Sequence, residues 1–455
     1  MRSSSLMIAG ALALWAAQVI PAQGWTQVYD AGHRDANGAW AGGSEVMHLV
    51  SHKGRLYAAN GYWEDARWKG VAHDDRQSAQ VLRLDAPDEP WQVDLDMGAV
   101  NDINGRYMKG NILKSVTFNV DGEPRNLLVM ASGNLTSHVS SWVRNDRTGK
   151  WTHQIVKSGT PEKGVRWVPR DVEVYRDKVT GVERIFMVLG NPGIISGVYD
   201  KSQPTSIRWD DDIEFPTEGA FSTRPLGITQ ANGKLYFSVG GVIYERRDGP
   251  RPTYEQVANL GDGVNTEIGG VRGLTPIPNP NGEGESILFM WTPNSRSAGC
   301  MKRLDPDGTG GYTLHEEACL GPLMGEALGV ETVYTLGAYS NIVPVTDPRS
   351  GETVRLVGFQ TKIKGAEHST WNGYYQGAMY AIRTSGQEYR LAEVNGRYAS
   401  GKPTLVAPRT FVRSPFAQEK GMLYVAGHDS NFQLSSDMAW VFRAPISEVL
   451  RPQSY

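Results

Sequence analysis

Arginine recurs beside short apolar runs in four separated segments of the sequence. These segments read VPRDVEVY, STRPLGIT, GVRGLTPI and FVRSPFAQ, and their arginines are Arg170, Arg224, Arg272 and Arg413. A guanidinium group is planar, permanently charged and able to donate two parallel hydrogen bonds, which suits a carboxylate or sulfate. Four such groups gathered at one place would need an anion, because buried like charges repel one another.

Histidines and aromatic residues recur in the loops that follow apolar strands. Histidine exchanges protons near neutral pH, so a loop histidine beside an anion site is a candidate acid or base. The residues of this kind are His73, His138, His368 and His428, with Tyr62, Trp63 and Tyr374 in the same loops and Tyr339 just before another apolar run. Each residue also has a structural interpretation. Arg170 could pair with Asp171 or Glu45, and a loop histidine could be exposed or locally bonded.

A repeat in the sequence supplies the elements that would gather these residues. Each arginine segment reads as a strand, a turn containing Gly or Asn, and a second apolar strand, and three further segments beginning at Ser44, Asn111 and Ser340 follow the same pattern. A third strand that usually ends in a charged residue follows each copy, and a fourth follows six of them. Seven units of four antiparallel strands predict an all-β fold, a seven-bladed β-propeller.

The last unit lacks a fourth strand, and the segment WTQVYD at residue 25 resembles the fourth strand KWTHQIV. We therefore expect the N-terminal strand to close the ring, which hides exposed strand edges. A pair of β-sandwiches is the alternative fold, but it does not explain the sevenfold recurrence. In a propeller, the loop before each innermost strand and the loop between its second and third strands open on one face. The arginines and loop histidines are thus expected at one mouth of the channel.

Composition and termini limit the class of protein. The chain has 455 residues, a net charge of -3, 52 glycines and 25 prolines, which favours many strands joined by turns and does not indicate nucleic-acid binding. The opening MRSSSLMIAGALALWAAQVIPAQG is typical of a secretory signal, with a membrane anchor as the alternative. We expect a signal peptide over 1–24, one propeller domain over 25–455, a secreted or periplasmic location, no membrane partner and a monomer.

The two cysteines, Cys300 and Cys319, flank the turn sequence DPDGTGG. If this segment is a hairpin, they face each other and form a disulfide, and the alternative is two buried free thiols. Two cysteines alone do not make a zinc site. The predicted chemistry requires no cofactor, although a structural calcium ion is compatible with the fold.

A face of arginine, histidine, tyrosine and tryptophan suits an acidic polysaccharide. Arginine would neutralise the C5 carboxylate of a uronic acid, a histidine or tyrosine would remove the C5 proton, and a second such group would protonate the leaving oxygen at C4. This is β-elimination, and arginine supplies the positive charge that a metal would otherwise provide.

The sevenfold pattern, the export signal and segments such as RDVEVYRDKVTGVERIF and SGVYD resemble the seven-bladed propeller polysaccharide lyases, in particular rhamnose–glucuronate lyases and ulvan lyases. The resemblance implies cleavage of glucuronate-containing glycans such as ulvan or gum arabic side chains. It implies carboxylate binding by Arg170 and Arg224 and acid–base roles for His138 and His73, with Tyr339 in reserve. The substrate-binding residues would be Arg272, Arg413, His368, His428, Trp63, Tyr62 and Tyr374.

Three other functions fit the same residues. A non-catalytic propeller that binds glycan or protein needs only the arginine and aromatic contacts. A glycoside hydrolase needs two carboxylates roughly 5 to 10 Å apart, and the candidates are Glu45, Asp74, Asp75, Asp171 and Glu367. A metal-dependent lyase would use the four loop histidines, but no tight ligand spacing such as HxH occurs.

Overall fold

The computed structural model describes residues 24–63, 77–99, 107–160, 165–217, 224–261, 269–338, 342–364, 373–394, 405–429 and 437–451. The predicted signal peptide therefore lies outside the described residues, apart from Gly24. The protein is all-β, with about 61% strand and 5% helix. No helix in the described ranges is long and apolar enough to cross a membrane.

Most strands belong to four-stranded antiparallel sheets. Three of these sheets follow chain order: β8 (Ile112–Val120), β9 (Glu123–Gly133), β10 (His138–Arg144) and β11 (Trp151–Ser158); β12 (Trp167–Arg176), β13 (Glu183–Gly190), β14 (Gly193–Tyr199) and β15 (Ile207–Pro216); and β16 (Pro225–Ala231), β17 (Lys234–Val239), β18 (Val242–Arg247) and β19 (Thr253–Asn259). A fourth contains β20 (Gly270–Pro278), β21 (Glu285–Thr292), β22 (Cys300–Pro306) and β23 (Tyr312–Cys319).

The next sheet has a divided inner strand. Both β24 (Thr332–Gly337) and β25 (Val343–Thr346) pair with β26 (Thr353–Ile363), which is followed by β27 (Met379–Arg383) and β28 (Tyr389–Glu393). The remaining elements outside the largest sheet are the hairpin β2 (His33–Arg34) with β3 (Trp40–Ala41), the helices α1 (Leu320–Leu328) and α2 (Ile446–Val449), and the 3-10 turns Met97–Ala99 and Ala417–Glu419.

The largest sheet has eight strands and contains both ends of the described chain. Its order is β1 (Thr26–Asp30), β31 (Trp440–Pro445), β30 (Met422–Asp429), β4 (Glu45–His52), β5 (Arg55–Gly61), β6 (Gln80–Leu84) and β7 (Gln92–Asp96), with β29 (Leu405–Arg413) also on β30. The predicted pairing of the N-terminal strand is confirmed, since Thr26 lies opposite Arg443 and Asp30 opposite Trp440. A single pair, His428 with Glu45, joins the halves β29–β30–β31–β1 and β4–β7.

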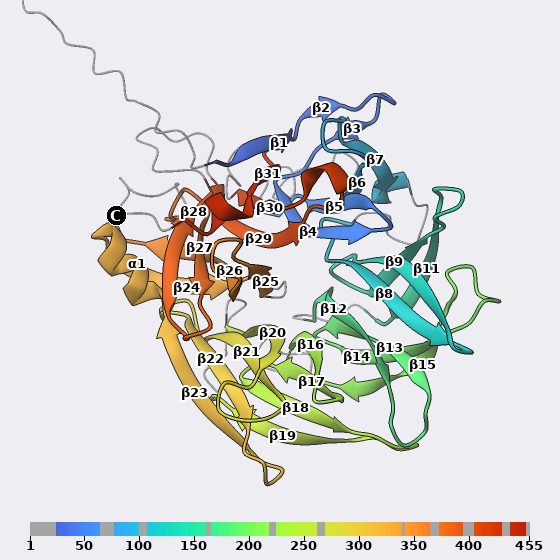
Figure 1. The fold of residues 1–455 in the computed structure, drawn as a ribbon. Coiled ribbons are helices and arrows are strands. Elements are labelled where there is room, and N and C mark those ends of the chain that lie inside the picture. The colour runs from blue at the N-terminus through green and yellow to red at the C-terminus, as the bar shows by residue number, and fades with distance from the viewer. Residues whose placement is uncertain are drawn as a thin grey trace, which may run out of the picture.

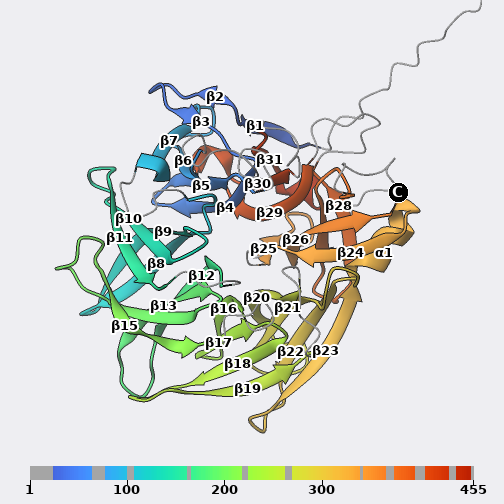
Figure 2. The same ribbon diagram turned by 180° about the vertical axis from the view of Figure 1, so that it is seen from behind.

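The sheets are arranged around a common centre, as the two opposite views show (Figures 1 and 2). The strands nearest that centre are β4, β8, β12, β16, β20, β25 and β29. Apolar side chains fill the spaces between neighbouring sheets. For example, Tyr57 and Val81 of one sheet pack with Leu128 and Trp142 of the next. This arrangement is consistent with a β-propeller.

Buried carboxylates on outermost strands tie neighbouring sheets together. Asp94 on β7 accepts hydrogen bonds from Arg144 Nε on β10 and Trp151 Nε1 on β11, each at 2.7 Å. Glu317 on β23 accepts from Arg383 Nε on β27 and Tyr389 Oη on β28, each at 2.6 Å. We call these contacts, together with those of Glu214 on β15 to Arg246 and Tyr254 at 2.8 and 2.7 Å, the outer-strand clamps. They account for the arginines near the ends of three third strands, Arg144 on β10, Arg246 on β18 and Arg383 on β27.

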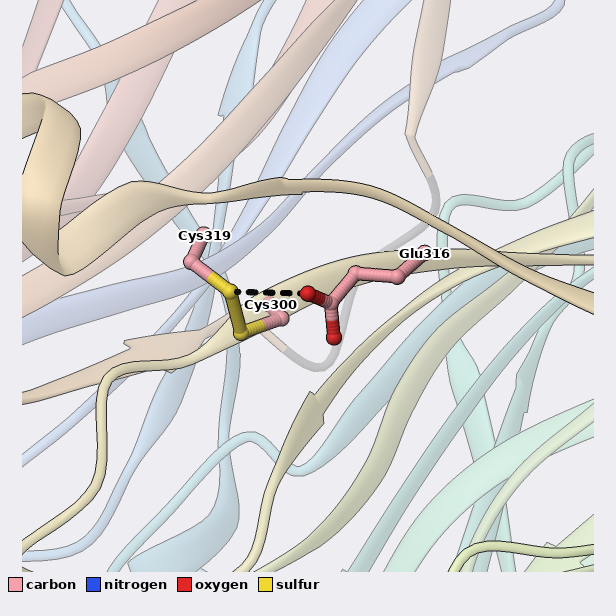
Figure 3. Close-up of side chains that lie close together, drawn as sticks. All are labelled: Cys300, Glu316 and Cys319. Atoms are coloured by element: carbon pink, nitrogen blue, oxygen red, sulfur yellow. Dashed lines mark hydrogen bonds between the residues drawn. A yellow bond between two sulfur atoms is a disulfide. The ribbon is translucent and has the colours of Figure 1, made fainter.

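The disulfide is confirmed, so the free-thiol alternative is wrong. Cys300 on β22 lies directly opposite Cys319 on β23, and their sulfurs are bonded (Figure 3). The Glu316 Oε1 atom lies 3.6 Å from Cys319 Sγ. In the described ranges these three residues form the one group close enough to hold a metal ion. Both sulfurs are committed to the disulfide, so this group offers no thiolate ligand.

Candidate functional site

Irregularities in the innermost strands position the arginines. The pairing of β12 with β13 jumps from Trp167–Gly190 to Asp171–Val188, and Arg170 lies within the jump. In β20 the pairing is irregular directly after Arg272, and in β29 an extra residue, Arg409, lies between the paired Pro408 and Thr410. Such bulges re-aim side chains at the rim of a sheet.

The expected position of Arg413 is wrong. The innermost strand of the last repeat begins at Leu405, so Arg413 lies at its far end, opposite Leu423. It is exposed, and its Nη2 donates a hydrogen bond to Thr346 Oγ1 at 3.4 Å. Arg409 takes the position predicted for Arg413. The missed signal is the dipeptide Pro408–Arg409, which repeats Pro169–Arg170 in the third unit.

Two cavities show which inner-strand cations come together. Arg272 and Arg409 line the same small cavity of about 10 Å³, with Met290, Val357 and Phe411 among its walls. Phe411 also borders a second cavity of about 160 Å³, which is lined by Arg170, His48, Lys114 and Asp171 among others. Arg170, Arg272 and Arg409 thus lie around adjoining spaces near the centre of the ring.

The four arginines Arg170, Arg224, Arg272 and Arg409 are all buried. The exposed fractions are 8% for Arg170, 1% for Arg224, 2% for Arg272 and 7% for Arg409. Arg224 directly precedes β16, the strand that packs between β12 and β20. These buried guanidinium groups carry positive charge near the centre of the ring, which favours a nearby anion.

Glu45 lies between two cations without closing a hydrogen bond. Its Oε2 is 3.7 Å from Arg409 Nη2, and its Oε1 is 3.9 Å from Lys109 Nζ. The Glu45 carboxylate is fully buried, yet neither of its oxygens accepts a hydrogen bond within the described residues. The Nε–H of Arg409 likewise donates no hydrogen bond within the described residues. We call Arg272, Arg409, Lys109 and Glu45 the arginine site. Lys109 precedes its inner strand much as the arginines do, a signal that sequence analysis missed.

His428 adjoins the arginine site. Its backbone pairs with Glu45, and its ring is completely buried. Burial, followed by the positive charges of Arg409 and Lys109, holds the pKa of His428 well below its usual value. The imidazole is therefore neutral at neutral pH, which is the form that accepts a proton.

A different carboxylate group surrounds Lys114 and balances its charge. Lys114 Nζ donates to Val172 O at 2.6 Å, Glu173 Oε2 at 2.9 Å and Asp171 Oδ1 at 3.3 Å. Asp171, a hydrolase candidate and the suggested partner of Arg170, is thus bonded to lysine. Glu45, the other described hydrolase candidate, contacts Arg409 and Lys109.

His138, the predicted base, lies at the start of β10 and is 1% exposed. Its Nε2 is 3.1 Å from Tyr107 Oη, which is also 2.9 Å from Ser140 Oγ. The Tyr107 ring packs edge-on against both His138 and Trp142. These contacts are those of a hydrogen-bonded core histidine, and its role as a base stays a prediction.

The predicted aromatic residues divide between the site and the core. Lys109 Nζ lies 3.7 Å from the centre of the Trp63 ring, so Trp63 borders the arginine site. Tyr62 is 1% exposed and donates a hydrogen bond to Gln77. The Tyr374 hydroxyl is 2.8 Å from that of Tyr334. The other predicted residues, His73, Tyr339 and His368, lie outside the described residues, as do Asp74, Asp75 and Glu367.

No family model and no curated protein matches the chain. Similar solved structures include a lectin from Aleuria aurantia in complex with Fucalpha1-6GlcNAc, with 10% identity and a TM-score of 0.38, covering 77% of this chain and 96% of that one. They also include the WD40 domain of SCAP from fission yeast, with 8% identity, a TM-score of 0.39 and coverage of 89% and 86%. A protein of unknown function from Dyadobacter fermentans has 11% identity, a TM-score of 0.39 and coverage of 93% and 99%.

Proposed function

We propose that the protein binds a carboxylate-bearing sugar, a uronic acid within a glycan, at the arginine site. The observation that carries this proposal is Arg409. Its guanidinium is buried, its Nε has no hydrogen-bond partner within the described residues, and it shares a cavity with Arg272. A carboxylate placed between these two groups would accept the charge-assisted hydrogen bonds that the Glu45 contact at 3.7 Å does not make.

We further infer that the ring has seven blades. Division of the eight-stranded sheet at the single His428–Glu45 pair gives two units of four strands. The five sheets formed by β8–β11, β12–β15, β16–β19, β20–β23 and β24–β28 supply the rest. On this assignment five different blades each contribute one cation from their inner strand or from the residues just before it. These cations are Lys109, Arg170, Arg224, Arg272 and Arg409.

Binding is tested by calorimetric titration of glucuronate-containing oligosaccharides from ulvan and gum arabic, with carboxyl-reduced versions of the same sugars as the ligand control. We expect the Kd to rise at least tenfold for the carboxyl-reduced sugars and for Arg409→Gln. Arg413→Gln is the matched control, because it removes a guanidinium from the exposed end of the same strand. Equal affinity of Arg409→Gln and Arg413→Gln for the acidic sugar would overturn the proposal.

β-Elimination is the second candidate, and His428 favours it. A carboxylate neutralised by Arg272 and Arg409 makes the adjacent C5 proton easier to remove. The same bound carboxylate offsets the cationic charges that lower the pKa of His428, so that its neutral imidazole can accept that proton. The C4–O bond then breaks, a C4–C5 double bond forms, and the leaving oxygen takes up a proton. Glycoside hydrolysis would instead release new reducing ends without a double bond.

The reaction is followed by the ultraviolet absorbance of the unsaturated product during incubation with ulvan or gum arabic. We expect His428→Ala to abolish the absorbance and to leave calorimetric binding of the acidic oligosaccharide within threefold. His138→Gln tests the base predicted from the sequence. Binding without absorbance in the unmodified protein would reduce the function to glycan recognition alone.

A further inference from the structure

A groove on the outer surface separates two neighbouring sheets, away from the arginine site. It has a volume of about 350 Å³ and lies between the outermost strands β11 and β15. These strands belong to neighbouring sheets and lie toward the outer edge of the molecule (Figures 1 and 2). We call this the rim groove, and its lining includes Gln154, Lys157, Arg208, Trp209, Asp210 and Asp211.

The groove exists because this sheet boundary lacks an outer-strand clamp. The sequence of β11, WTHQIVKS, contains no carboxylate, and the sequence of β14, GIISGVY, contains no arginine. Two side chains bridge the strands instead: Gln154 Nε2 donates to Ile207 O at 3.2 Å, and Lys157 Nζ donates to Asp211 O. The outer strands therefore lie next to each other without being drawn together.

The lining has the composition of a sugar site. Trp209 is half-buried and supplies an aromatic wall, and the polar groups around it include both donors and acceptors. Lys157 and Arg208 carry two positive charges and Asp210 and Asp211 two negative ones, so the groove has no net charge. Its preferred ligand is thus uncharged and rich in hydroxyl groups, unlike the ligand of the arginine site.

An extended peptide fits this groove less well than a sugar. A peptide that adds to a sheet edge needs free backbone groups on that edge. The β15 carbonyl groups of Ile207 and Asp211 already accept hydrogen bonds from Gln154 and Lys157. A peptide would have to displace both side chains, whereas a sugar can use their remaining hydrogen-bonding capacity.

We propose that the rim groove is a second carbohydrate-binding site, specific for a neutral oligosaccharide segment. It is independent of the arginine site, since its ligand carries no carboxylate. Arg208 is the side chain most available to such a ligand, because it is 56% exposed and its only close carboxylate in the described structure, Asp200, is 3.7 Å away.

The test is calorimetric titration of the whole mature protein with cello-, xylo-, manno- and malto-hexaose. We expect at least one of these sugars to bind saturably and Arg208→Ala or Asp211→Asn to raise its Kd at least fivefold. Arg176→Ala is the matched control, because Arg176 is 51% exposed on another strand of the same sheet. Arg409→Gln should leave this binding unchanged, which separates the rim groove from the arginine site.

Three outcomes overturn the proposal: no saturable binding of any of the four sugars, equal losses in Arg208→Ala and Arg176→Ala, or loss in Arg409→Gln alone. An alternating Thr-Val octapeptide serves as the competing probe. Binding of that peptide in place of the sugars, abolished by Arg208→Ala, would assign the groove to a protein partner. Trp209 is not mutated first, because its ring packs against Gly197 and its loss could disturb the fold.

Discussion

Residues at the centre of the ring combine buried cations with two neutral histidines, the half-buried His48 and the buried His428. His48 lies on β4, and its Nε2–H donates to Asn111 O at 2.8 Å. Burial, opposed by this hydrogen bond and reinforced by Lys114 and Arg409, lowers the pKa of His48 to about 4. The pKa of His428 is also lowered, and burial is again the largest cause. Both imidazoles are therefore neutral at neutral pH in the folded protein without a bound ligand.

The first prediction concerns stability in mild acid. The unfolded chain takes up a proton on His48 near pH 6.5, whereas the folded chain does so only near pH 4. The folded state therefore loses stability as the pH falls through this window, by about 3 kcal/mol for His48 at roughly 1.4 kcal/mol per pKa unit. Urea unfolding at pH 7 and pH 4.5 should show a smaller difference for His48→Gln than for the unmodified protein. Equal differences would contradict the assignment.

The outer-strand clamps help to hold neighbouring sheets together. The Glu317 carboxylate on β23 is 2% exposed and holds Arg303 of its own sheet and Arg383 of the next, whose side chains are 2% and 4% exposed. The hydrogen bonds from Arg383, Tyr389 and Arg303 outweigh burial and lower the pKa of Glu317. Each clamp thus acts as a buried pair whose members depend on one another.

The second prediction is that Glu317→Gln destabilises the fold by about 3 kcal/mol, because it leaves the buried Arg383 guanidinium without its carboxylate, whereas Arg303 keeps Asp305. The matched control is Glu255→Gln, which removes a 55%-exposed partner of Arg247 on β18. An exposed pair of that kind contributes about 1 kcal/mol or less. Chemical denaturation of both variants measures the difference, and similar midpoints would show that the clamp contributes little.

The elements were largely predictable from the sequence, and the contacts between them were not. Alternating apolar residues and turn signals predicted the four-strand repeat, the missing last strand and its replacement by WTQVYD. The innermost strand of the last repeat is the apolar stretch LVAPRTFV, which lies before the segment predicted from the sequence. The buried arginine of this strand is therefore Arg409 and not Arg413. The Asp94–Arg144 contact joins two sheets, and the Glu45–Arg409 contact joins the two halves of the eight-stranded sheet. No local sequence pattern specifies which charged residues pair over such distances along the chain.

At the scale of the whole molecule, β1 on β31 joins the two ends of the described chain. Trp25 and Tyr29 are 7% and 3% exposed and pack in two separate core clusters. Without this strand, β31 would have an open edge that can pair with other molecules. The N-terminal strand β1 therefore covers the edge of β31.

The third prediction follows from this closure. A chain that begins at Gly32 lacks β1 and should aggregate or self-associate, whereas a chain that begins at Gly24 should not. Size-exclusion chromatography with light scattering measures the mass, and thermal unfolding should show a lower Tm for the shorter chain. A monomer with an unchanged Tm would show that β1 is dispensable.

The pairing of β1 with β31 also determines when β1 can fold. The ribosome synthesises β1 early. Its pairing partner β31, which begins at Trp440, is synthesised more than four hundred residues later. Until then the leading segment has no native partner, and any premature stop upstream of Trp440 leaves it permanently unpaired. In a truncated chain, proteases would thus find the unpaired β1 at the N-terminus, far from the missing C-terminal residues.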